Sequence, residues 1–187
     1  ILRRWWPEAE VVFGHPGELR AGLHDGHIDR HTAVCDLPRH PDCGLSIDHH
    51  QSNAPGEDED GGVVIIWRET PSAARIAYDL LEGEVDLSDL EDMLTWVDKL
   101  DGGGINREEF RSDHPVIWLG RVVDTESGIA FHILESLQHG VSVDDILSGP
   151  AVAPALEHRR ARQAEMDSVI AENTHVVDRL AIVRLEN

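Results

Sequence analysis

The chain has 187 residues, 41% of them hydrophobic, enough for one large domain or for one domain and part of a second. Its net charge of −20 argues against a surface that coats nucleic acid, because phosphate backbones would be repelled, but it permits a local cationic or metal-filled pocket. No stretch approaches a membrane span, and two cysteines are too few for a disulfide framework, so we expect a cytoplasmic protein.

The first segment, 1–7, has no signal-peptide pattern and is typical of the last turn of a helix. It also lacks an initiator methionine, so we expect the native chain to begin upstream. A short strand is predicted at 10–13, and a polar helix or loop at 17–31.

Two short apolar runs follow, at 32–36 and 45–48, and both are predicted to be buried parallel strands. The first ends in Asp36 and the second in Asp48, which is followed by His49 and His50. Because neighbouring parallel strands present their carboxyl ends at one edge of a sheet, these side chains are expected to form a site there.

A third strand is predicted at 62–67 from its β-branched residues. The loop before it carries an acidic run at 57–60. Such runs are usually solvated, so an exposed loop is favoured over a second metal site.

The rest of the chain is predicted to be mainly helical. Thr70 as N-cap and Pro71 at the first helical position indicate a helix to residue 81, and Ser88 with Glu91 is typical of a capping box. Further helices are expected at 88–101, 115–139 (ended by Gly140), 141–146 and 151–172, and strands at 176–177 and 180–185.

The acidic and imidazole side chains suit a two-metal phosphoesterase. Such an enzyme needs carboxylates for two divalent ions, an oriented imidazole ligand and a group that contacts phosphate. Asp36, Asp48, His49, His50 and Asp101 are the candidates, and a mixed oxygen and nitrogen set suits Mn²⁺, with Mg²⁺ as the alternative. Adjacent histidines on an extended chain point to opposite sides, so His49 and His50 are expected to do different work.

One position in this set stays open. Asp98 lies one helical turn before Asp101, and either could be the ligand. Asp98 could instead pair with Lys99 or Arg107 on the helix surface. Three glycines after Asp101 break the helix and allow close backbone approach.

At this point the sequence resembles the DHH phosphoesterase superfamily, over roughly residues 1–140. The resemblance rests on the aspartate-ended strand, on the Asp-His-His-x-Ser-Asn motif that ends at Asn53, on the helix that follows, and on 98–104. It implies that Asp36 bridges two metal ions, and that His49 and Asp101 are further metal ligands.

The same resemblance implies that Asp48 orients His49 from behind the metal ligands, and that His50 and Asn53 contact substrate. The chain departs from the family in two places. The His-x-Asp-x-Asp-type first motif is absent and is expected to lie upstream, and the fourth motif reads Asp-Gly-Gly.

These observations predict a doubly wound α/β domain with a mainly parallel sheet over 1–140. A helical linker at 141–174 and the possible start of a substrate-binding domain at 175–187 are expected to follow. The predicted function is metal-dependent hydrolysis of a phosphodiester or phosphoanhydride in a small phosphorylated substrate or short oligonucleotide. The alternative is a non-catalytic nucleotide-binding or regulatory module with a degenerate site. A homodimer stays open, and no membrane partner is expected.

Overall fold

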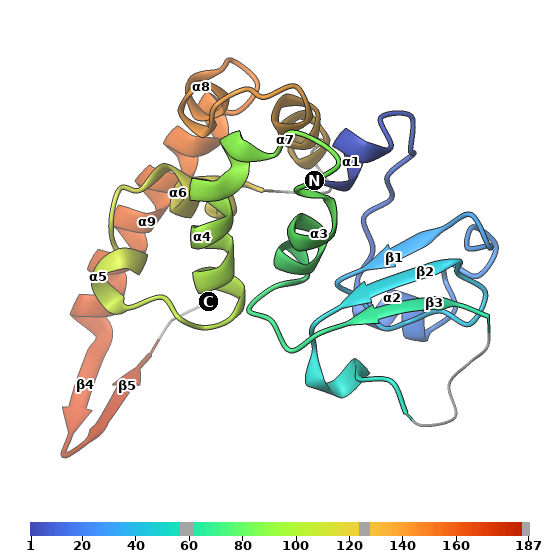
Figure 1. The fold of residues 1–187 in the computed structure, drawn as a ribbon. Helices are drawn as coiled ribbons and strands as arrows, with labels where there is room; N and C mark the ends of the chain where they lie inside the picture. Colours follow the sequence, from blue (N-terminus) through green and yellow to red (C-terminus); the bar gives the residue numbers. More distant parts are fainter. Residues whose placement is uncertain (57–61, 124–127, 185–187) are drawn as a thin grey trace. The chain divides into compact units, whose positions relative to one another are not determined.

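The computed structural model describes residues 1–56, 62–123 and 128–184 (Figure 1). The chain divides into two compact units, Ile1–Ser112 and Asp113–Asn187. The division falls ahead of the helix α6 (Pro115–Val122). Within the second unit, α6 packs against both α8 (Val143–Ser148) and α9 (Ala153–Asn173). The helical linker and the following domain expected from the sequence stay a prediction.

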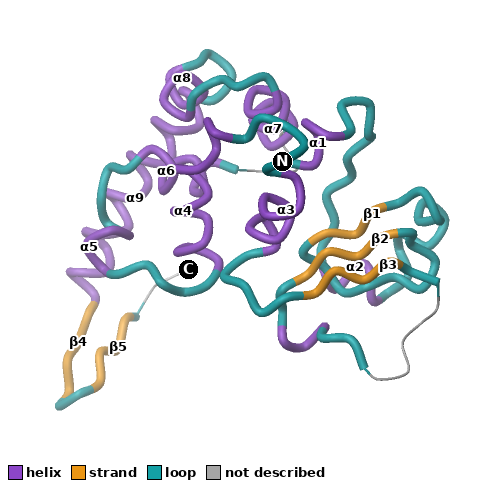
Figure 2. Tube along the Cα trace, viewed as in Figure 1, coloured by secondary structure: helices purple, strands orange, loops and turns teal. Residues whose placement is uncertain are grey.

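The first unit contains a three-stranded parallel sheet in the order β1-β2-β3 (Figure 2). The strands are β1 (Ala33–Cys35), β2 (Leu45–Asp48) and β3 (Val64–Trp67). Cys35 lies opposite Ile47, and Asp48 lies opposite Trp67. Since all three strands run the same way, their carboxyl ends share one edge. The predicted α/β fold class with a mainly parallel sheet is confirmed.

These short apolar runs form strands because the neighbouring strands and the side chains that pack over the sheet bury them. Val34 of β1 packs with Cys43 and Val63, and Leu19 of the helix α2 (Pro16–Arg20) packs on the same cluster. The strand expected at 10–13 is absent. Val12 there is 65% exposed, and without a neighbouring strand or buried face the segment stays irregular.

Helices follow the sheet in the first unit, but two of them begin differently from the prediction. The helix α3 (Ala73–Leu81) has Ser72 as N-cap, whose hydroxyl accepts from the backbone N–H of Arg75, so Thr70 and Pro71 lie ahead of the helix. Ser88 is not part of a capping box, because its hydroxyl donates to Asp86. The other elements are α1 (Leu2–Trp5), the 3₁₀ turns η1 (Gln51–Asn53) and η2 (Ser88–Leu90), α4 (Glu91–Asp101) and α5 (Arg107–Phe110).

The second unit is helical and ends in an antiparallel hairpin. Besides α6, α8 and α9 it contains α7 (Ile129–Gln138), β4 (Thr174–Val177) and β5 (Leu180–Val183). Gly140 has a φ of 75° just past α7, and the N–H of Val141 donates to the carbonyl of Ser136, which closes the helix end. The acidic run at 57–60 lies outside the described residues. No described helix is both long and apolar enough to cross a bilayer.

Candidate metal centre

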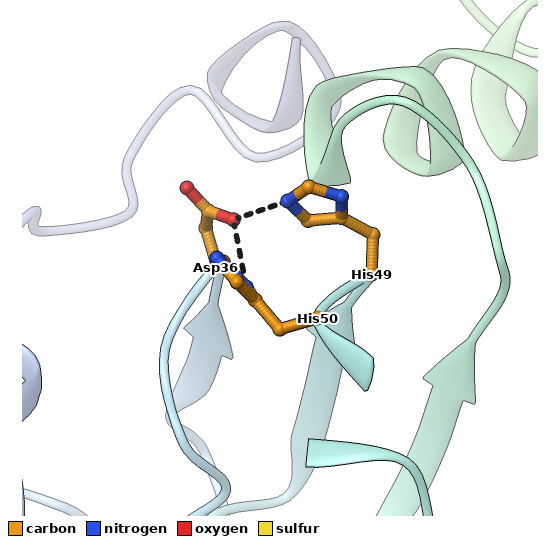
Figure 3. Close-up of side chains that lie close together, drawn as sticks. All are labelled: Asp36, His49 and His50. Atoms are coloured by element: carbon orange, nitrogen blue, oxygen red, sulfur yellow. Dashed lines mark ion pairs between the residues drawn. The ribbon is translucent and has the colours of Figure 1, made fainter. Parts of the chain in front are cut away.

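Asp36 leaves the end of β1 in an unusual backbone conformation. Its φ is 61°, in the left-handed region that residues other than glycine rarely adopt, although aspartate tolerates it better than most. Its N–H still donates to the carbonyl of Ile47 at 2.9 Å, so the strand pairing continues to this residue. The turn directs the carboxylate toward the imidazoles of His49 and His50 (Figure 3). Such backbone strain, which costs roughly 1–3 kcal/mol, is concentrated at functional sites.

The imidazole of His49 is fixed by the backbone and offers one nitrogen to the site. Its Nδ1 lies 3.1 Å from the carbonyl of Thr70. A carbonyl only accepts, so Nδ1 must carry the proton and Nε2 keeps its lone pair in the neutral ring. Nε2 lies 3.3 Å from Oδ1 of Asp36 and 3.2 Å from Oδ2 of Asp101. This atom is buried and has no hydrogen-bond partner among the described residues.

A lone pair facing two carboxylate oxygens is an arrangement that a cation would complete. With the neutral ring, all three atoms carry electron pairs that face one another. Burial, and then the charge of Asp101, raises the pKa of Asp36, and the two histidines have the opposite effect. The contribution of Asp101 reflects repulsion between the two carboxylates. The residues therefore fit a divalent ion with mixed oxygen and nitrogen ligands.

The two aspartates of α4 have different surroundings. Asp98 accepts from the Ser72 hydroxyl at 2.7 Å and from two nitrogens of Arg75, at 2.9 and 2.6 Å. Asp101, one turn later at the end of the helix, faces His49. The structure therefore brings Asp101 to the site and uses Asp98 to attach α4 to the start of α3, with neither Lys99 nor Arg107 as its partner.

The family resemblance implied that Asp48 orients the ring of His49, but Asp48 does not contact that ring. It is 3% exposed, and its Oδ1 accepts from the backbone N–H groups of His49 and His50, at 2.7 and 3.0 Å, and from Nδ1 of His50 at 2.8 Å. Its Oδ2 accepts from the Asn53 amide at 2.5 Å. Burial alone would raise the pKa of Asp48, but these hydrogen bonds lower it below its usual value. Asp48 is therefore an ionised anchor for His50, while the Thr70 carbonyl orients His49.

The rings of His49 and His50 lie close together, with centroids 4.4 Å apart. The expected divergence to opposite sides is not seen, because β2 ends at Asp48 and the chain then turns into η1, where strand alternation no longer applies. The His50 side chain is 45% exposed, and its hydrogen bond to Asp48 raises its pKa. Nδ1 of His50, which is held by Asp48, also lies 3.7 Å from Oδ1 of Asp36, so Nε2 is the nitrogen left to contact a phosphate.

Three predicted residues thus offer ligand atoms within 4.8 Å of one another: Asp36, His49 and His50. Asp101 lies beside this group, because its Oδ2 is close to Nε2 of His49. Asn53 holds the motif's turn through Asp48, and its contact with substrate stays a prediction. Sequence reasoning missed the Thr70 carbonyl, which no side-chain pattern reveals. It also missed Ser72 and Arg75, whose only signal was polarity at the start of an apolar helix.

The comparisons with known proteins concern the fold. No protein-family model matches the chain, and no curated protein matches its sequence. Among solved structures, the chain shares its α/β fold with a phosphodiesterase. That structure is the pGpG-specific phosphodiesterase PggH from Vibrio cholerae, with a TM-score of 0.77 and 22% identity. The match covers 97% of this chain and 62% of that one, so the chain spans less than two thirds of its neighbour's length.

Proposed function

We propose that this chain is a metal-dependent phosphoesterase. It hydrolyses a phosphodiester or phosphoanhydride in a small nucleotide, a short oligonucleotide or a pyrophosphate-like substrate. The observation that carries the proposal is the buried Nε2 of His49, which lacks a hydrogen-bond partner in the described chain and faces the carboxylates of Asp36 and Asp101. The fold shared with a phosphodiesterase that acts on pGpG supports a small nucleotide as substrate.

Asp36, His49 and Asp101 would hold the metal, with Mn²⁺ the better match and Mg²⁺ the alternative, and a pair of ions is proposed. When bound, such ions lower the pKa of a coordinated water enough for hydroxide to form near neutral pH. The Thr70 carbonyl keeps the proton of His49 on Nδ1, so that Nε2 stays a donor.

His50 is assigned to the phosphate. Asp48 holds its Nδ1 and raises its pKa, which favours the charged imidazolium. A cationic ring at the edge of the site offers an N–H to a phosphate oxygen and offsets part of the negative charge that Asp36 and Asp101 bring. The burial of Asp48 keeps this ring in one orientation while the rest of the side chain is exposed.

The test is hydrolysis by the purified chain with Mn²⁺, using pyrophosphate, bis-phosphorylated nucleotides, pGpG and single-stranded DNA. Turnover of a small phosphate compound is expected in the wild type and is expected to be lost in Asp36→Asn. The matched control is Asp92→Asn, an exposed aspartate on the same helix as Asp101, and it should retain turnover. Mn²⁺ binding with no hydrolysis of any substrate would contradict the enzyme and favour a regulatory nucleotide-binding module.

A further inference from the structure

The second unit carries a group of arginines that are not part of the proposed metal centre. Arg121 belongs to α6, and Arg159, Arg160 and Arg162 are exposed on α9, which packs against α6. We call these four residues the arginine cluster. The chain has 36 acidic residues and a net charge of −20, and three of these arginines lie together within 159–162.

Trp118 holds two members of the arginine cluster in place. The Cζ of Arg121 lies 4.5 Å from the centroid of the Trp118 ring, and that of Arg160 lies 4.9 Å from it. The indole is buried, and its Nε1 donates to Asp113 at 3.0 Å, which fixes the ring itself. Guanidinium groups stacked on a fixed aromatic ring lose less conformational freedom when they bind an anion.

The surface around the cluster is hollowed in two places, and Arg159 lines both. One hollow, of about 370 Å³, combines an apolar floor with cationic side chains: Val122, Ile129, Ala155, His158, Arg159 and Arg162. The other, of about 280 Å³, is lined by Trp118, Arg121, Arg159 and Gln163. A floor of aliphatic groups beside guanidinium groups suits a ligand with both an apolar body and a negative charge.

Within the described part of the chain, no carboxylate forms an ion pair with the arginines of α9. No acidic residue stands four positions before or after any of the three arginines. Glu157 and Glu165 stand three positions from Arg160 and Arg162, but neither forms an ion pair with them. Within the described ranges, no carboxylate lies at ion-pair distance from Arg159, Arg160 or Arg162. Among the described residues, the charges of these three arginines therefore have no carboxylate partner.

We propose that the arginine cluster is a second binding site, for the phosphate of a small nucleotide. Arg159 and Arg162 bind the phosphate oxygens, because the planar guanidinium presents paired N–H donors that match phosphate geometry. The nucleoside lies on the floor formed by Val122, Ile129 and Ala155. This site goes beyond the proposed hydrolysis and does not depend on it, since no residue of the metal centre takes part.

The test is isothermal titration of the full chain with AMP and GMP in EDTA, so that the metal centre cannot contribute. The comparison ligands are inorganic phosphate, adenosine and a tetraglutamate peptide. We expect the mononucleotides to bind, phosphate to bind more weakly, and adenosine and the peptide not to bind. The double variant Arg159→Ala/Arg162→Ala should bind AMP roughly tenfold more weakly or worse, because charge-assisted hydrogen bonds are lost.

Arg179→Ala, an exposed arginine of the same unit, is the matched control, and thermal unfolding by circular dichroism checks that each variant folds. Asp36→Asn should bind AMP like the wild type, which separates this proposal from the proposed hydrolysis. Unchanged AMP affinity in the double variant would overturn the site. Peptide binding as tight as AMP binding would overturn the assignment to phosphate, and phosphate binding as tight as AMP binding would overturn the nucleoside floor.

Discussion

The Nε2 atom of His49 lies 3.2 Å from Oδ2 of Asp101. This contact brings the end of β2 and the end of α4 together. The two residues lie far apart in the sequence, so it is the fold that brings them together. His49 is 10% exposed in its side chain, so the carboxylate approaches a largely desolvated ring. In such surroundings a shared cation stabilises both groups, and its absence leaves an electron pair facing an anion.

Asp101→Asn should weaken Mn²⁺ binding while leaving the fold intact, because the amide removes a charged oxygen from the ion and keeps the side chain's shape. The affinity for Mn²⁺ should fall by at least the roughly 10–100-fold that is typical when a residue hydrogen-bonded to a metal ligand is replaced. Isothermal titration with Mn²⁺ measures it, and Asp92→Asn on the same helix is the control. Equal affinity in the two variants would contradict the assignment of Asp101.

Asp98→Asn should act on stability. The amide cannot accept as strongly from Arg75 and Ser72, and it leaves a partly buried guanidinium without its counter-charge. We expect a loss of about 2 kcal/mol in the free energy of unfolding, measured by urea denaturation. Asp101→Asn should lose much less. If Asp98→Asn instead abolished Mn²⁺ binding without loss of stability, Asp98 would be the ligand.

The difference between these two aspartates shows where sequence reasoning ended. The strands with their acidic ends could be predicted, because apolar runs and the Asp-His-His motif are local signals. The choice between Asp98 and Asp101 could not, because it depends on which face of α4 lies against the segment 70–72. A Cβ on Gly102 would come within 3.1 Å of the Pro71 side chain, so that approach is close, and only the tertiary fold sets it.

The orientation of the histidines shows the same limit. Strand alternation predicted that His49 and His50 diverge, but the strand ends one residue too early for that rule. The hydrogen bonds of Asp48 then decide the outcome, and they involve backbone N–H groups that no sequence pattern displays. The fold class was therefore accessible from sequence, whereas the partner of each imidazole was not.

His50 should titrate above the usual range for histidine. Asp48 accepts from its Nδ1 and raises the pKa, so the stabilising contact is fully present below the unfolded-state pKa and is lost as pH rises through the folded-state pKa. NMR titration of the imidazole C–H signal, assigned with His50→Gln, should show this, and Asp48→Asn should move the pKa down. A His50 signal that titrates identically in both proteins would refute the contact.

The two cysteines should react slowly in the folded protein. Burial, followed by the charge of Asp36, raises the pKa of Cys35 to about 11, and burial also raises the pKa of Cys43. The thiolate is the reactive form, so little of it exists at neutral pH. Ellman's reagent should therefore titrate both thiols quickly only after unfolding. Rapid reaction of Cys35 in the native state would show that the end of β1 opens readily.

The central claim is that Nε2 of His49 coordinates a metal ion, and pulsed EPR of the Mn²⁺-loaded chain tests it most directly. A directly coordinated imidazole gives a nitrogen hyperfine coupling to Mn²⁺. We expect that coupling in the wild type and in His50→Gln, because Asp48 holds the Nδ1 of His50, and we expect it to disappear in His49→Gln. A coupling that survives in His49→Gln and disappears in His50→Gln would contradict the account.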